Sequence, residues 1–234
     1  MSPVVDATSP EFRPAAVEAA AAAVRDGRLV VLPTDTVYGI GCDAFDADAV
    51  QRLLDAKGRG REMPPPVLVG DIRTIDGLAA DVAPYVRDLV EAFWPGPLTV
   101  IVHAQPSLHW DLGDTNGTVA LRMPNDDTAL ALLREVGPMA VTSANLSGAS
   151  PAHSVLEAAT ALGAAVDVYI DAGRREDLAP STILDCTGDE PVVLRLGSLD
   201  ADRLAAVVTL HSPLDDAPPE PEADELDPRA PEIE

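Results

Sequence analysis

The amino-acid sequence predicts an α/β fold, a single-domain twisted mixed sheet flanked by helices. Short apolar runs typical of buried strands alternate along the chain with segments of helical periodicity. Some neighbouring runs have only short connections between them, which favours a sheet of mixed strand direction. The length of 234 residues suffices for one core of ordinary size. We therefore expect one folded domain over residues 1–212 and a tail over residues 213–234.

The first part of the chain alternates helix and strand. The segment from Ala15 to Arg25 is alanine-rich and amphipathic, which predicts a helix. Two apolar runs, Leu29 to Leu32 and Val37 to Cys42, then predict strands. Asp46 is a typical N-cap residue, so we expect a second helix to begin there, with Lys57 just past its C-terminal end. The apolar residues on one face of this helix are Ala49, Val50, Leu53 and Leu54.

The remaining chain continues this alternation up to about residue 208. Short apolar and β-branched runs predict further strands, and the stretches between them have helical periodicity. The expected strands are Val67 to Val69, Leu98 to His103, Val119 to Leu121, Met139 to Thr142, Val168 to Ile170, Thr182 to Asp185 and Val192 to Leu194. The expected helices lie near Val82 to Phe93, Thr128 to Glu135, Val155 to Leu162 and Asp200 to Val208.

The composition changes at Pro213, where the chain becomes rich in proline and acidic residues. This last segment contains nine carboxylates and one arginine, with almost no apolar residue. Such a segment cannot bury enough apolar surface to fold, so we predict a disordered acidic tail. It is either a solvated extension or an interaction segment.

Charge and cysteine content limit the classes of function. The net charge of −23 repels a nucleic-acid backbone unless a local basic patch overrides it. The two cysteines, Cys42 and Cys186, have no C-x-x-C spacing, so we expect buried thiols and neither a disulfide nor a zinc site. The histidines are scattered without metal-ligand spacing. No signal peptide and no apolar run of about 18 residues is present, which favours a cytoplasmic protein.

The first of three polar segments follows the strand that ends at Leu32. It contains two hydroxyls, a carboxylate, a tyrosine and two close glycines, at Thr34, Asp35, Thr36, Tyr38, Gly39 and Gly41. Such a strand end offers hydrogen-bonding groups beside backbone that a ligand can approach closely. Two alternatives are a purely structural turn and a G-x-G-x-x-A dinucleotide fingerprint, for which Asp71 would be the ribose-binding acid.

The second segment, KGRGREMPPP, concentrates positive charge in an otherwise acidic chain. Lys57, Arg59 and Arg61 are interleaved with glycines. Arginine forks and a lysine ammonium suit the oxygens of a triphosphate, so this loop indicates phosphate binding. The alternative is a solvated helix end, where cations favour the helix dipole.

The third segment, TSANLSG, begins at Thr142 and follows an apolar strand. Its small hydroxyl and amide side chains stand at the C-terminal end of a strand, where α/β sheets commonly bind ligands. Asn145 could equally cap the turn with its own side chain. Ser143 lacks a G-x-S-x-G context, so a serine hydrolase is not expected.

Six motifs follow one another along the chain: PTDTVYGIGCDA from Pro33, K-G-R from Lys57, WPGPLT from Trp94, VALRMP from Val119, TSANLSG from Thr142 and PSTILD from Pro180. In this order they resemble the YrdC-like family of threonylcarbamoyl-AMP synthases, and the resemblance covers about Ala15 to Val208. The chain resembles the short form of the family, without the extra C-terminal domain that some members carry.

The resemblance implies an enzyme that condenses L-threonine, bicarbonate or CO₂, and ATP into L-threonylcarbamoyladenylate and releases pyrophosphate. Mg²⁺ would accompany the ATP. The product would serve the threonylcarbamoyladenosine modification of tRNA through downstream transferring proteins, and direct tRNA binding is not expected. An alternative function is that of an RNA-binding or assembly module, which the net charge disfavours.

The resemblance also implies roles for particular residues. Lys57 and Arg59 would be catalytic. The expected ATP-binding residues are Lys57, Arg59, Arg61, Thr118, Ser143, Asn145 and Arg195, and the expected threonine-binding residues are Thr36, Arg122, Thr142 and Ser181. The sequence departs from the family pattern at Leu68, where many relatives have a histidine, and at Asn125-Asp126 after the R-x-P segment. Both departures concern the expected contacts to threonine.

Overall fold

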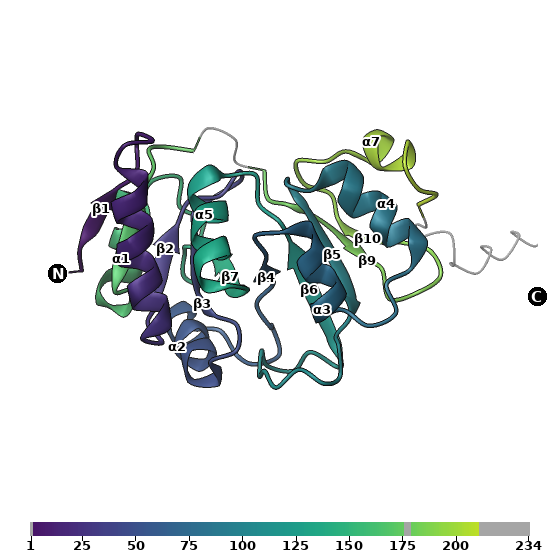
Figure 1. Cartoon of the computed structure of the whole chain (residues 1–234), viewed down its shortest axis with the longest axis horizontal. Helices are drawn as coiled ribbons and strands as arrows, with labels where there is room; N and C mark the ends of the chain where they lie inside the picture. The colour runs from purple at the N-terminus through teal and green to yellow at the C-terminus, as the bar shows by residue number, and fades with distance from the viewer. Residues whose placement is uncertain (1, 176–178, 211–234) are drawn as a thin grey trace, which may run out of the picture.

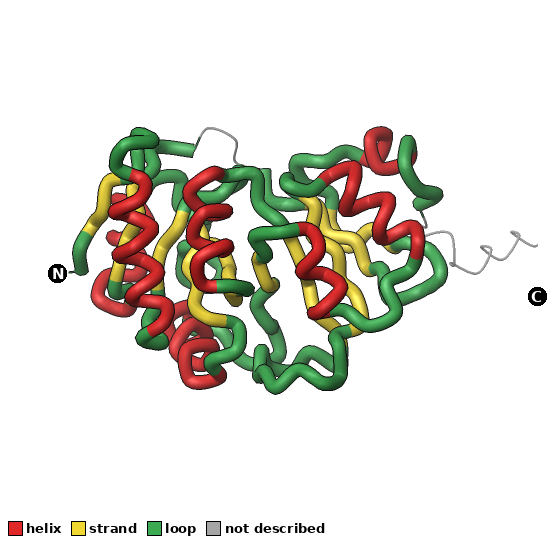
Figure 2. Tube along the Cα trace, viewed as in Figure 1, coloured by secondary structure: helices red, strands yellow, loops and turns green. Residues whose placement is uncertain are grey.

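A computed structural model of the chain describes residues 2–175 and 179–210. They form one mixed sheet of ten strands flanked by helices (Figure 1), which confirms the predicted fold class. The predicted tail, residues 213–234, lies outside the described residues. Figure 2 shows the strands as a band across the molecule, with helices on both sides and loops at the strand ends.

The elements follow one another in the expected alternation. The helices of at least four residues are α1 (Arg13–Arg25), α2 (Ala47–Lys57), α3 (Ile75–Leu78), α4 (Pro84–Phe93), α5 (Asp127–Val136), α6 (Val155–Leu162) and α7 (Ala201–Ala205). The strands are β1 (Val4–Asp6), β2 (Val30–Leu32), β3 (Gly39–Asp43), β4 (Val67–Leu68), β5 (Leu98–His103), β6 (Thr118–Arg122), β7 (Met139–Ser143), β8 (Val168–Asp171), β9 (Thr182–Asp185) and β10 (Val192–Arg195).

The strand order across the sheet is β1-β8-β2-β3-β7-β4-β6-β5-β9-β10. Parallel pairs join β1 to β8, β8 to β2, β4 to β6 and β5 to β9, and the other neighbours are antiparallel. The central strands β7, β4 and β6 are neighbours in the sheet, so they bring the TSANLSG segment, the end of the basic loop and the VALRMP motif together although these are far apart in the sequence.

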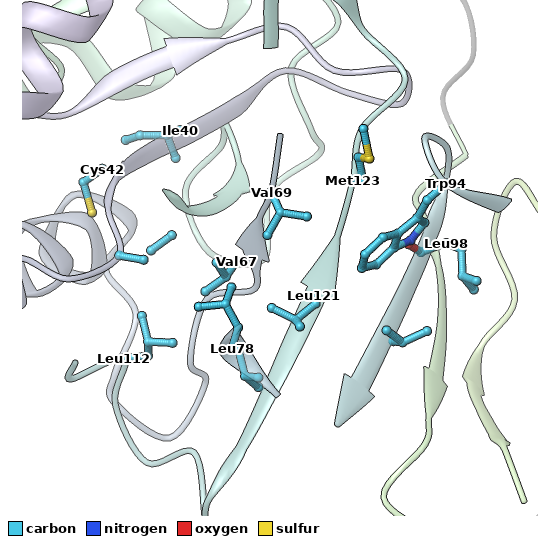
Figure 3. Close-up of a cluster of buried hydrophobic side chains, with 14 of the residues drawn as sticks. Ile40, Cys42, Val67, Val69, Leu78, Trp94, Leu98, Leu112, Leu121 and Met123 are labelled. Atoms are coloured by element: carbon cyan, nitrogen blue, oxygen red, sulfur yellow. The ribbon is translucent and has the colours of Figure 1, made fainter. Parts of the chain in front are cut away.

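Each face of the sheet has its own apolar cluster, because successive side chains of a strand point to opposite faces. Val30 and Leu32 of β2 pack in a cluster with α1 and α5. Val31, between them, belongs to a larger cluster that includes α2, α3, α4 and α6. Figure 3 shows part of this larger cluster, where Val67 and Val69 lie near Leu121. The two groups of helices therefore cover opposite faces of the sheet. Within the described residues, part of one face is not covered by helices and can form a site.

The structure differs from the prediction at a few element ends. The helix predicted from Ala15 begins at Arg13, with Pro14 in its first turn, where the absent N–H of proline costs nothing. β1 was not predicted. The strand predicted from Val37 begins only at Gly39, because Tyr38 is drawn into contacts with another segment: its hydroxyl donates to the Gly173 carbonyl (2.6 Å).

The two glycines of β3 allow close packing between strands and do not form a phosphate-binding turn. Gly39 and Gly41 lie inside a strand that is paired on both sides, with β2 and β7. A Cβ atom at either position would stand 2.6 Å from a methyl carbon of Val141. A dinucleotide fingerprint requires a strand, a tight turn and a helix. That alternative interpretation of the sequence is therefore wrong.

Candidate active site

A cavity of about 510 Å³ opens on the face of the sheet that α1 and α5 cover further along. Leu68 of β4 belongs both to the cluster beneath those helices and to the cavity wall. Beyond it, β6, β5 and β9 supply Ala120, Ile101 and Ile183 as an apolar floor. Cavities of this volume commonly hold small molecules. The hydroxyl and cationic residues that line it are Thr34, Thr36, Arg59, Thr99, Arg122, Thr142, Ser143, Ser181 and Arg195.

Lys57 stands at the end of α2 and is buried beneath the turn that follows β7. Gly58, with φ 59°, ends the helix in the left-handed conformation and turns the chain. The Lys57 ammonium donates to the carbonyl oxygens of Ser143 and Asn145, and the Asn145 side-chain oxygen is 3.4 Å away. Lys57 is only 3% exposed and does not line the cavity. Burial, and then the charge of Arg59, lower its pKa to about 8.

Asn145 completes this turn and also lies outside the cavity wall. Its side-chain amide donates to the carbonyls of Leu146 (2.8 Å) and Ala149 (2.7 Å). The alternative that Asn145 caps the turn therefore describes its contacts, and Lys57 fastens the same turn from the other side. Together they fix the position of Ser143, which does line the cavity.

Arg59 lines the cavity, two residues past the end of α2. Its Nη1 donates to the Thr142 hydroxyl (3.2 Å), and its buried Nε has no hydrogen-bond partner within the described residues. Burial lowers the pKa of the guanidinium. A partly buried cation with an unsatisfied N–H is suited to an anionic ligand.

Arg61, the third cation of the same loop, points away from the cavity. Its guanidinium donates to Asp111 (2.6 Å) and has Asp114 at 3.8 Å. The Arg61 side chain is 45% exposed and does not line the cavity. The sequence placed all three cations together, whereas the structure brings only Lys57 and Arg59 to the β7 end.

Arg122 also lines the cavity and is the last residue of β6. Its Nε donates to the Gly96 carbonyl (3.1 Å), its Nη1 to the Thr36 hydroxyl (3.2 Å), and its Nη2 to the Asp35 carboxylate. Burial lowers the pKa of Arg122, and the charge of Asp35 opposes that effect. The guanidinium therefore stays charged in a largely dry place.

Hydroxyl groups continue from Arg122 along the chain after β2. The Thr34 and Thr36 hydroxyls are 3.1 Å apart, and Thr34 donates to the Val37 carbonyl (2.6 Å). Both threonines are less than 5% exposed. The predicted site residue Thr36 is thus brought to Arg122, while Thr142 belongs to the Arg59 side.

Arg195, on β10, is held by Ser181, the residue before β9. Its Nε and Nη2 donate to the Ser181 carbonyl at 3.0 and 2.8 Å, and the Ser181 hydroxyl lies 2.9 Å from that of Thr99. Arg195 is close enough to Arg122 for its charge to lower the pKa of Arg122. Ser181 and Arg195 thus line one wall together.

The sequence prediction missed some residues of the site, and four predicted residues, Lys57, Arg61, Thr118 and Asn145, do not line the cavity. Thr99 lines the cavity and Gly96 holds Arg122, although neither was proposed as a site residue. Both belong to the WPGPLT motif, which was the available signal. Thr118 donates to the Thr115 carbonyl (2.8 Å) and lines a smaller neighbouring cavity of about 130 Å³.

Other expectations concern cysteines, metals and membranes. Cys42 and Cys186 are free and buried, as predicted, and burial raises the pKa of both thiols to about 12. Within residues 2–175 and 179–210, no group of three or more His, Cys, Asp or Glu side chains could hold a metal ion. No helix in the same part of the chain is long and apolar enough to cross a membrane.

Comparison with known proteins identifies relatives in sequence and in fold. A protein of Mycobacterium tuberculosis named "Putative threonylcarbamoyl-AMP synthase" is 53% identical over 208 residues, 89% of this chain and 96% of that protein. The structure of P. abyssi Sua5 complexed with L-threonine has a TM-score of 0.84 and 30% identity. It covers 90% of this chain, which spans only 63% of that protein. E. coli YciO has a TM-score of 0.77 and 27% identity, covering 87% of this chain and all of YciO.

The sequence also matches a family model directly. Residues 22–197 match the Sua5/YciO/YrdC model, whose description is "Telomere recombination". The matched residues include all six motifs in full and every residue that lines the cavity. The chain belongs to the Sua5/YciO/YrdC family.

Proposed function

We propose that this protein is an L-threonylcarbamoyladenylate synthase that uses L-threonine, bicarbonate or CO₂, and ATP, and releases pyrophosphate. The observation that carries the proposal is a single cavity lined both by the buried Arg122, which contacts the Thr36 hydroxyl, and by Arg59, whose Nε lacks a partner within the described residues. An amino acid and a nucleoside triphosphate need sites of these two kinds in the same cavity. The names of the M. tuberculosis relative and of the Sua5 complex support it.

The threonine carboxylate would bind Arg122. Arginine forks match carboxylates, and a buried guanidinium binds one more strongly than an exposed one does. Thr36 and Ser181 would supply hydroxyl groups around the amino acid, and Thr142, which accepts a hydrogen bond from Arg59, would do so where the amino acid meets the nucleotide. Leu68, which replaces the histidine of many relatives, adds an apolar contact to the same cavity.

The triphosphate would bind at the β7 end. Arg59 would contact phosphate oxygens directly, together with Ser143, and Arg195 would approach from the opposite wall. Lys57 and Asn145 would act by holding the 143–149 turn, and Lys57 would add a positive charge from beneath it. Arg61 and Thr118 stand outside this cavity and would contribute least.

The reaction would proceed in two steps. The threonine amine attacks the carbon of CO₂ and loses a proton, which gives a carbamate. A carbamate oxygen then attacks the α-phosphorus of ATP, a new P–O bond forms, and the bond to the β-phosphate oxygen breaks as pyrophosphate leaves. Because the cations and hydroxyls are already in place, the protein would act by positioning and by neutralising charge.

Mg²⁺ would enter with ATP. This ion usually keeps several waters and binds phosphate oxygens with few protein ligands, which fits a cavity whose polar lining consists of hydroxyls and cations. When bound, it would neutralise phosphate charge. The adenylate would pass to proteins that transfer the threonylcarbamoyl group to tRNA.

The direct test is pyrophosphate release by the purified full chain in the presence of ATP, Mg²⁺ and bicarbonate. We expect release that depends on L-threonine and is much slower with L-serine. Release that is the same without an amino acid, or none from a folded protein, would contradict the proposed function.

A further inference from the structure

Asp35 is a partly buried carboxylate beside the site, and the proposed reaction does not yet use it. It lies between Thr34 and Thr36, which both line the cavity, but Asp35 itself does not. Its carboxylate accepts a hydrogen bond from Nη2 of Arg122, and the two side chains are 13% and 8% exposed. Asp35 therefore stands beside Arg122 and leaves the space in front of it open.

The hydrogen bonds of Arg122 leave a particular pair of donors. A guanidinium has five N–H groups. Gly96, Thr36 and Asp35 accept one each, from Nε, Nη1 and Nη2. Within the described residues, one N–H remains on each terminal nitrogen. Two N–H groups on the two terminal nitrogens are what a carboxylate needs for a two-point contact.

The charges around Arg122 explain why an acidic partner is required. Arg195 repels Arg122 across the cavity, and burial also disfavours its charge. Asp35 is the carboxylate that opposes both effects. Without it, a buried guanidinium would turn toward water or toward another acceptor.

We infer that Asp35 is a positioning residue, which holds Arg122 so that its two remaining terminal N–H groups face the carboxylate of the amino-acid substrate. The identity of that substrate rests on the proposed function. In the proposed role, Asp35 contacts neither the substrate nor the reacting atoms. Its effect is confined to the amino-acid end, because the cations of the β7 end have other supports.

The test compares Asp35→Asn with the wild-type full chain, using L-threonine and ATP as separate probes. We expect the dissociation constant and KM for L-threonine to rise about tenfold, and the KM for ATP to change less than about twofold. Asp35→Glu keeps the charge and should lose less. Asp111→Asn makes the same change at the exposed Arg61 pair and should leave both KM values unchanged.

A second measurement separates positioning from a general loss of structure. In an Arg122→Lys background there is no fork to orient, so Asp35→Asn should weaken threonine binding by less than about threefold. Equal effects of Asp35→Asn in both backgrounds, or threonine binding in Asp35→Asn as tight as in the wild type, would overturn the inference. If Asp35→Asn does not fold, Asp35→Glu is compared in the same two backgrounds.

Failure of the proposed function has a different signature. A wild-type protein that neither binds L-threonine nor releases pyrophosphate would contradict the function itself. A wild-type protein that does both, with an Asp35→Asn variant that does both equally well, would remove only the role of Asp35.

Discussion

Two arginine–aspartate pairs of this protein consist of the same groups in different surroundings. Arg122 and Asp35 are 8% and 13% exposed, whereas Arg61 and Asp111 are 45% and 49% exposed. Water screens the exposed pair and competes for its hydrogen bonds, so that pair contributes little. The buried pair has few alternatives, so removing either partner leaves a charge without compensation.

Basic residues that are close together in the sequence therefore do not have the same role at the site. Arg59 and Arg61 are two residues apart, yet only Arg59 lines the cavity. Arg61 is drawn away by the loop that carries Asp111 and Asp114. Function is therefore expected to follow burial and partners more closely than charge.

The largest effect should come from the buried pair. Arg122→Ala removes the proposed carboxylate contact and leaves Asp35 buried without a cation. We expect pyrophosphate release at low threonine concentration to fall about 1000-fold, with unfolding easier by about 3 kcal/mol. Steady-state kinetics and urea unfolding measure the two effects. Activity within about threefold of the wild type would contradict the role of Arg122.

The next effect concerns Arg59. Arg59→Ala removes a cation whose Nε lacks a partner in the described structure, so folding should change little. We expect pyrophosphate release to fall about 100-fold, since a charge-assisted contact to the leaving phosphates is lost. ATP titration and kinetics check this, and an unchanged KM for ATP together with unchanged turnover would show that Arg59 binds no phosphate.

The lowered pKa of Lys57 predicts that the reaction rate depends on pH. Its pKa is lowered to about 8, so its positive charge is lost as pH rises through that value, and the rate should fall on the alkaline side. In the unfolded chain the pKa of Lys57 is about 10.5. Between about pH 8 and pH 10.5 the unfolded chain therefore holds this proton more often than the folded protein does, so the free energy of unfolding rises with pH in that range. A pH–rate profile tests this.

The two cysteines and a substitution of Lys57 provide controls for the pH–rate profile. The thiols of Cys42 and Cys186 have pKa values of about 12 and do not titrate near pH 8. Lys57→Arg, if folded, keeps its charge and should move the alkaline fall upward. An alkaline fall at the same pH in this variant would assign the titration to another group.

The smallest effect is expected at the exposed pair. Arg61→Ala should lower pyrophosphate release by less than about twofold, because Arg61 is paired at the surface and does not line the cavity. The same assay measures it. A loss as large as that of Arg59→Ala would mean that Arg61 leaves Asp111 and reaches the triphosphate.

The sequence predicted most of the fold because strand and helix periods are local signals. It missed β1, a three-residue edge strand whose existence depends on pairing with β8. It placed Val37 and Tyr38 in a strand, although Tyr38 makes contacts with Gly173 and Ala152, more than a hundred residues away. Such contacts have no signature in the local sequence.

The site was predicted in part for the same reason. The motifs identified the strand ends and the cations, and the structure brings Arg59, Arg122, Ser181 and Arg195 to one cavity. The sequence could not distinguish Arg61 from Arg59, nor show that Lys57 lies beneath the wall, because these depend on how loops pack. Asp35 was visible as a carboxylate, but its partner could not be inferred.

The proposed reaction can be tested by tracing the carbon of bicarbonate into the product. The wild-type protein is incubated with ATP, Mg²⁺, L-threonine and ¹³C-bicarbonate, and the products are analysed at once by mass spectrometry. We predict an adenylate that contains both threonine and the labelled carbon, formed together with pyrophosphate. An unlabelled threonyl adenylate, or pyrophosphate without any threonine adenylate, would contradict the account.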